Sequence, residues 1–94
     1  MIESVAVLIG NSDNKLSQEQ WCCYTGKMRE TIAYWFKEIH FVGGSSFDSK
    51  FQNACYVGTI ETSRKRSFLD VVGDVRDEFY QDSAAVIFGQ TTMA

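Results

Sequence analysis

Three short polar segments each adjoin an apolar run in this 94-residue chain. They are Gly10 to Lys15 (GNSDNK), Phe47 to Ala54 (FDSKFQNA) and Gln81 to Ser83 (QDS). The amides, hydroxyls and carboxylates of these segments donate and accept hydrogen bonds, so together they could bind a sugar, a phosphate or a nucleotide. The same residue types are ordinary turn formers, and each segment taken alone is better explained as a turn.

The sequence contains no complete catalytic motif. His40 is the only histidine and falls within an expected strand, and no G-x-S-x-G, Walker or G-x-G-x-x-G pattern occurs. Asp13, Asp48 and Asp82 could together hold a divalent cation through carboxylate oxygens, although solvated loop acids explain them more simply. We therefore expect no cofactor and no metal ion, and this interpretation leans against an enzyme.

The enzymatic alternative is a small α/β-barrel enzyme built from two subunits, a monooxygenase or an isomerase. Such enzymes work in a pocket between helices and sheet. The residues that could line this pocket are Trp21, Trp35, His40 and Tyr56. Packing in a hydrophobic core explains the aromatic residues equally well.

Charge and cysteine content argue against several classes of protein. The formal net charge is −3 and the isoelectric point is about 5.0, so the chain lacks the basic face that duplex nucleic acid demands. Its only basic cluster runs from Arg64 to Arg66. Cys22, Cys23 and Cys55 lack C-x-x-C spacing, which indicates reduced core thiols in a cytoplasmic protein. No apolar run is long enough to span a membrane, and we expect no membrane partner.

Hydrophobic periodicity predicts four strands and two helices. The strands are expected over residues 4–9, 38–42, 53–60 and 84–92, with a bulge at Gly58 in the third strand. Ser17 and Gln20 form a capping-box pattern, which predicts a helix of about five turns from this point to Phe36. The second helix is expected over residues 67–80, with Ser67 as its cap. A start at Ser63 would put the cluster Arg64 to Arg66 in the first turn, against the helix dipole.

The element order β-α-β-β-α-β predicts an α+β fold of the ferredoxin-like type, formed by residues 1–94 as a single domain. Right-handed crossovers then give a four-stranded antiparallel sheet with strand order 4-1-3-2 and both helices on one face. In this arrangement the connections that carry the three polar segments lie at the same end of the sheet.

This convergence predicts a polar rim, with the free N–H groups at the start of the first helix beside it. Side chains of the rim would bind the ligand, Lys15 and Lys50 would supply positive charge, and a base could stack on Trp21 or Phe47. The basic cluster lies at the opposite end and would reach a phosphate only across an oligomer. The candidate ligand-binding residues are Asn11, Ser12, Asp13, Lys15, Trp21, Phe47, Lys50, Gln52, Asn53, Arg64, Arg66, Gln81, Asp82 and Ser83.

Two helices can cover only one face of the sheet, yet the expected strands are apolar on both faces. In the first strand Val5, Val7 and Ile9 point one way, and Ala6 and Leu8 point the other. An uncovered apolar face is typical of an interface, so we expect a homodimer or a larger homo-oligomer packed through the open sheet face. The rims of neighbouring subunits could then combine into shared pockets.

The segments IGNSDNKLSQEQW (Ile9 to Trp21), QNACYV (Gln52 to Val57) and YQDSAAV (Tyr80 to Val86) resemble a group of small proteins from bacteriophages and bacteria. The resemblance implies a protein that acts by binding, as small phage proteins without a catalytic motif often do. One class of them, the nucleotide sponges, sequesters cyclic nucleotide signals of bacterial antiviral defence within small oligomers.

The sequence therefore favours a non-enzymatic, oligomeric protein that sequesters a small polar ligand, such as a cyclic nucleotide. A small barrel enzyme and a protein-interaction module that uses the sheet face are the alternatives.

Overall fold

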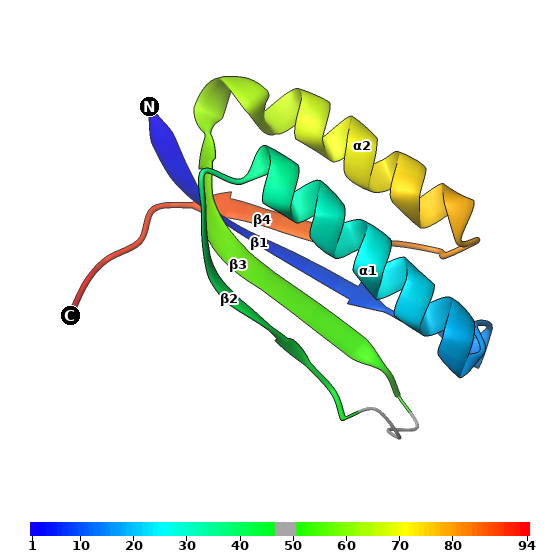
Figure 1. Ribbon diagram of the computed structural model, residues 1–94. Coiled ribbons are helices and arrows are strands. Elements are labelled where there is room, and N and C mark those ends of the chain that lie inside the picture. Colours follow the sequence, from blue (N-terminus) through cyan, green and yellow to red (C-terminus); the bar gives the residue numbers. More distant parts are fainter. Residues whose placement is uncertain (47–50) are drawn as a thin grey trace.

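The computed structural model of the chain describes residues 1–46 and 51–94. Within these ranges the elements follow the predicted order, and the helices form a layer on one side of the sheet (Figure 1). Neither described helix has the length and apolar character needed to cross a membrane. The bounds are β1 (Ile2–Gly10), α1 (Gln18–Trp35), β2 (Glu38–Gly44), β3 (Asn53–Glu61), α2 (Lys65–Glu78) and β4 (Ala85–Gly89).

The strands of the described chain form one antiparallel sheet in the order β2-β3-β1-β4. Read from the β4 edge, this is the predicted order 4-1-3-2. α1 and α2 lie side by side on one face and leave the other face open (Figure 1). The chain is therefore an α+β protein with an open antiparallel sheet, as the sequence predicts.

β1 is a central strand, and its alternation separates the two faces of the sheet. Val5, Val7 and Ile9 point toward the helices and are almost completely buried, whereas Leu8 on the opposite face is 40% exposed. The helices and the sheet face below them enclose the hydrophobic core. Its buried members are Val5, Val7, Ile9, Trp21, Tyr24, Met28, Ile32, Phe36, Tyr56, Ile60, Phe68, Val72 and Val75.

Helix α1 begins where the capping-box pattern predicts. The Ser17 hydroxyl accepts a hydrogen bond from the Gln20 N–H at 3.2 Å, and the Gln20 side chain accepts one from the Ser17 N–H at 2.8 Å. The prediction of core thiols is wrong for Cys22 and Cys23, which are exposed. Helical spacing turns both side chains away from the buried stripe that includes Tyr24.

Helix α2 begins at Lys65, two residues earlier than predicted, so the argument from the helix dipole is wrong here. Groups outside the helix offset its basic first turn. Lys65 Nζ lies 3.0 Å from a carboxylate oxygen of Glu3, and this contact lowers the pKa of the Glu3 carboxyl. The Arg64 guanidinium lies 4.4 Å from the centre of the Trp35 ring. These tertiary contacts outweigh a dipole cost of about 0.3–1 kcal/mol, and Ser67 lies inside the helix instead of capping it.

Two predictions about the strands also need correction. β4 ends at Gly89, three residues short of the expected end, because its pairing with β1 stops there. The irregularity expected at Gly58 lies on the facing strand, where the register shifts between Ile39 and Phe41. A Cβ atom at Gly58 would collide with the main-chain carbonyl oxygen of Glu38, so glycine is needed for β2 to pass this closely.

Candidate functional site

The three polar segments meet at the end of the sheet where β1 finishes. The β1–α1 connection, the start of β3 and the α2–β4 connection lie together at this end (Figure 1). The Ser12 N–H donates a hydrogen bond to Gln81 Oε1 at 2.8 Å, and Lys15 Nζ lies 3.0 Å from Asp82 Oδ1. The predicted convergence of these loops into a polar rim is therefore confirmed for the described residues.

Asn11 is the structural centre of the rim. Its Nδ2 donates hydrogen bonds to Leu16 O and to Gln52 Oε1, both at 2.9 Å, and its Oδ1 accepts one from the Leu16 N–H at 2.9 Å. Only 9% of the residue is exposed. Buried amides require such partners, and these bonds close the β1–α1 turn and tie it to β3. Both amide hydrogens of Asn11 are thus used inside the protein.

Gln52 and Gln81 are buried in the same way. Gln52 Nε2 donates to Gln18 Oε1 at 2.8 Å, which connects the start of β3 to the first turn of α1. Gln81 accepts from Ser12, as described, and its Nε2 donates to Phe79 O at 3.1 Å. With Asn11, these side chains hold the loops of the rim in place. A ligand would therefore meet the exposed groups of the rim.

The rim borders a pocket of about 360 Å³ where the polar loops meet the open sheet face. Leu8 and Ala85, which are paired between β1 and β4, belong to the open face and form its apolar side. We name this the rim pocket. Its lining residues are Leu8, Gly10, Asn11, Ser12, Phe51, Gln52, Asn53, Ser83 and Ala85. Five of the predicted ligand-binding residues are thus brought to one pocket.

Phe51 was not predicted as a site residue. Its side chain is 77% exposed and lines the rim pocket together with Asn53. Nothing in the sequence distinguishes this phenylalanine from the buried aromatic residues of the chain. Its neighbour Gln52 is buried just before β3, a difference that only the folded chain shows.

The aromatic stacking surface predicted for the rim needs correction. Trp21 is only 8% exposed, and its ring packs edge-to-face against Tyr24 with the centroids 5.9 Å apart. It belongs to the core, and Phe51 is the exposed aromatic residue among the described residues that line the rim pocket. Phe47 and Lys50, the other predicted contacts in this region, lie outside the described residues.

The basic cluster lies at the opposite end of the sheet, as expected from the topology (Figure 1). Arg64 donates a hydrogen bond to Trp35 O at 3.2 Å in addition to its contact with the indole ring. Arg66 is exposed on the first turn of α2. Within one subunit, neither arginine can reach a ligand in the rim pocket.

The described part of the rim gathers no set of metal ligands. No group of three histidine, cysteine, aspartate or glutamate side chains comes together in the described ranges. Asp82 is ion-paired, and Asp13 adopts left-handed backbone (φ 53°), which aspartate tolerates well in turns. Asp48 lies outside the described residues. His40 lies toward the other end of the open face, where its Nε2 is 3.6 Å from a carboxylate oxygen of Glu38.

Comparison with known proteins places the chain in no family. No protein-family model matches it, and no curated protein gives a significant match. The resemblance to small phage and bacterial proteins stays a prediction. The function must therefore be inferred from the geometry of the chain itself.

Proposed function

We propose that this protein is a non-enzymatic, homo-oligomeric binding protein that holds a small polar ligand in the rim pocket. The proposal includes a single ferredoxin-like domain over residues 1–94 and a location in the cytoplasm. The order of the elements and of the strands supports the ferredoxin-like assignment. The observation that carries the functional proposal is the position of the rim pocket, between rigidly held polar loops and an uncovered apolar face.

The rim pocket combines the two kinds of surface that small-ligand sites use. Leu8 and Ala85 supply the apolar side, and Ser12, Asn53 and Ser83 bring hydroxyl and amide groups to the polar side. Its volume of about 360 Å³ lies within the usual range for such sites, roughly 300–1,000 Å³. The buried amides behind the wall keep the loops in one conformation, which lowers the entropy cost of binding.

A nucleotide is the ligand class that this chemistry favours. Phe51 presents an exposed aromatic ring on which a base can stack, and Asn53 lines the same pocket with an amide that can bond to the base edge. Lys15 is the rim cation that would meet a phosphate, in competition with Asp82. Within this class, the resemblance to small phage proteins supports a cyclic nucleotide of bacterial antiviral defence, which the protein would sequester.

The open sheet face supports assembly with a second copy of the chain. Leu8, Phe41 and Ile87 on this face are 40%, 56% and 59% exposed, and Ala6, Val57 and Ile87 border a further hollow of about 190 Å³. Exposed apolar surface of this extent usually marks an interface. Leu8 belongs to both the open face and the rim pocket. A second subunit on this face would therefore also close the pocket and slow the release of the ligand.

A small barrel enzyme has less support than a binding protein. Of the residues that its pocket would need, Trp21 and Tyr56 line a groove beside α1, whereas His40 lies on the open face. Trp35 packs against Phe68. These residues do not converge on a common pocket in the described chain, so they form no site for proton transfer. A protein-interaction module that uses the open face is the remaining alternative.

Native mass spectrometry of the purified protein tests both parts of the proposal. Spectra are recorded for the protein alone and with a panel of cyclic and linear nucleotides. We expect a dimer or larger oligomer that gains the mass of a compound from the panel and returns this compound unchanged on denaturation. An oligomer that gains mass from no nucleotide contradicts the nucleotide proposal. A monomer at every protein concentration contradicts the assembly, and a chemically altered compound favours an enzyme.

Matched variants assign the binding to the rim pocket. Asn53→Ala and Ser83→Ala each remove one polar group from its wall, and we expect each to weaken binding about two- to tenfold, the worth of one hydrogen bond. Ser67→Ala removes an exposed hydroxyl from α2, away from the pocket, and should leave the affinity unchanged. If all three variants bind the ligand as tightly as the wild-type protein, the ligand lies elsewhere, and the open face remains as a protein-interaction surface.

A further inference from the structure

A second hollow lies on the helix side of the sheet, between α1 and the edge strand β2. It has a volume of about 340 Å³. Cys22, Gly26 and Arg29 of α1 form one wall, and Val42 and Gly44 of β2 lie along the other. We name it the α1–β2 groove. It shares only Asn53 with the rim pocket and lies on the opposite face of the sheet, so the proposed nucleotide site does not account for it.

β2 is a free sheet edge along this groove. In the described sheet it pairs with β3 alone, and its side chains are exposed over nearly the whole strand. The N–H of Ser45, which follows β2, donates to Asn53 O of β3 at 3.0 Å. Hydrogen bonding alternates along an antiparallel strand, so Gly43 faces β3 as well, and the peptide groups of Val42 and Gly44 face outward. An outward row of this kind is a template for another strand.

Gly26 makes the helix wall of the groove shallow. It lies in the interior of α1, where glycine weakens a helix, and its backbone does not need glycine because its φ is not positive. A Cβ atom at this position would meet nothing within 4 Å. The packing of the chain therefore does not require glycine here, and the space beside it is open to another molecule.

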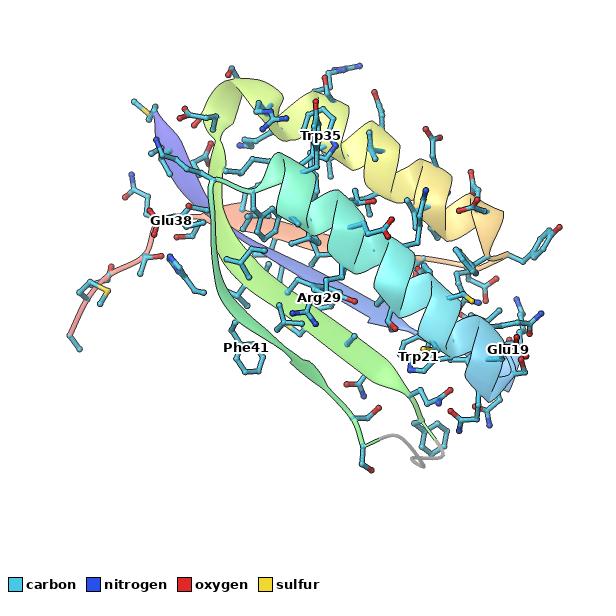
Figure 2. All side chains as sticks on the ribbon, in the orientation of Figure 1. Glu19, Trp21, Arg29, Trp35, Glu38 and Phe41 are labelled. Carbon is cyan, nitrogen blue, oxygen red and sulfur yellow. The ribbon has the colours of Figure 1, made fainter. Side chains whose placement is uncertain are left out.

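Arg29 gives the groove a positive charge. Figure 2 shows its side chain extending from α1 over the sheet toward β3 and β2. Arg29 makes no ion pair with any other described residue. The nearby Tyr56 hydroxyl is already used, since it donates to Thr25 O at 3.2 Å. The charge of Arg29 is thus left for an anionic group that enters the groove.

We propose that the α1–β2 groove binds an extended peptide that adds a strand to β2 and places an acidic side chain against Arg29. The outward peptide groups of Val42 and Gly44 would pair with the backbone of the peptide, and the groove would take its side chains on the helix side. Only a peptide offers backbone donors and acceptors at the spacing of the edge together with a carboxylate. This activity is separate from nucleotide binding and does not depend on it.

The test begins with a phage-displayed library of random linear peptides, selected on the wild-type protein and depleted of binders to an empty support. Gly26→Leu, which takes no part in the selection, is the variant that blocks the groove. The leucine side chain fills the groove without meeting other atoms of the chain at its Cβ. A selected peptide is then synthesised with a fluorescent label, and its affinity is measured by fluorescence anisotropy. Gly73→Leu is the matched control, because Gly73 lies inside α2, lines no part of the groove and also has open space at its Cβ position.

We expect the selected peptides to contain an aspartate or glutamate. Arg29→Gln should weaken binding about tenfold or more, as the loss of a charge-assisted hydrogen bond requires. Gly26→Leu should abolish binding, and Gly73→Leu should leave it unchanged. Amide hydrogen exchange at Val42 and Gly44 should slow when the peptide is present, which a contact made only through side chains would not cause.

Three results would overturn the proposal. In the first, the library gives no peptide that is enriched over selection on an empty support. In the second, the selected peptide binds Gly26→Leu as tightly as it binds the wild-type protein. In the third, the amides of Val42 and Gly44 are protected from exchange without peptide, and this protection rises with protein concentration. That third result would show that a second copy of this chain occupies the edge.

Discussion

Replacing Asn11 tests whether the amides of the rim hold the structure together or remain open to a ligand. Asn11→Ala removes three hydrogen bonds at 2.9 Å, two to the main chain of Leu16 and one to Gln52. A buried hydrogen bond contributes about 1 kcal/mol net, so the free energy of unfolding should fall by about 3 kcal/mol. This is a large share of the roughly 5–15 kcal/mol that stabilises a domain.

The isosteric change Asn11→Asp separates the hydrogen bonds from the shape of the side chain. Gln52 can donate to the new carboxylate when its amide and that of its partner Gln18 both rotate, but the Leu16 carbonyl can only accept, so repulsion remains there. The repulsion and the burial favour the protonated acid and raise the pKa of the carboxyl above its value in the unfolded chain, about 4. The stability of this variant should therefore recover as the pH falls to about 4 and be lost again as the pH rises through the folded-state pKa.

Urea unfolding followed by tryptophan fluorescence, at one protein concentration for all variants, measures these changes. Asn53→Ala is the control, because Asn53 is exposed and its amide makes only one long hydrogen bond within the described part of the chain, 3.4 Å to Phe51 O. It should change the free energy of unfolding by no more than about 0.5 kcal/mol. A loss below about 1 kcal/mol for Asn11→Ala, with an unchanged dependence on urea, would refute the structural role of the buried amides.

Four further predictions concern the core, the edge strand and the open face. Burial raises the pKa values of Tyr24 and Tyr56 to about 12. The stability should therefore fall as the pH rises from about 10 toward 12, because both phenols ionise on unfolding. In a titration followed by tyrosinate absorbance, Tyr56→Phe should lose part of the increase that the wild-type protein shows at the highest pH. Tyr24→Phe should leave stability unchanged or higher, since the buried Tyr24 hydroxyl has no hydrogen-bond partner in the described chain, and a loss above about 1 kcal/mol would contradict this. Gly58→Ala should destabilise the protein by several kcal/mol in urea unfolding, because its methyl group collides with the Glu38 carbonyl, and a neutral result would show that β2 moves away easily. Ile87→Asp should convert the oligomer to monomers in sedimentation velocity, whereas unchanged sedimentation would exclude the open face as the interface.

Local patterns predicted the elements well where neighbouring residues decide the structure. Ser17 and Gln20 satisfy each other within one helical turn, so the start of α1 follows from their spacing alone. The start of α2 depends instead on Glu3 and Trp35, which are distant in the sequence and contact Lys65 and Arg64. A dipole argument that considers only one helix cannot include such contacts, and it placed this helix two residues too late.

The candidate site shows the same division between local and distant information. The element order was sufficient to bring the polar loops together, because alternating directions put them at one end of the sheet. It could not distinguish Asn11 from Asn53, which are the same residue type at neighbouring places on the rim. Burial separates them: Asn11 is 9% exposed and fully bonded, whereas Asn53 is exposed. For the same reason, Trp21 was predicted at the rim and Phe51 was omitted, since both are aromatic and only the folded chain decides which is buried.

In the proposed oligomer, the position of the rim pocket would connect ligand binding to assembly. Leu8 lies at the junction of the open face and the pocket, so a subunit packed on this face and a ligand in the pocket would share a boundary. If each stabilises the other, the coupling is reciprocal, and ligand would tighten the oligomer as much as the oligomer tightens ligand binding. An enzyme in this arrangement would be slowed, because turnover requires the product to leave through the covered side. Sequestration has no such requirement, and slow release favours it. A pocket at the margin of the proposed interface would therefore be better matched to holding a ligand than to converting it.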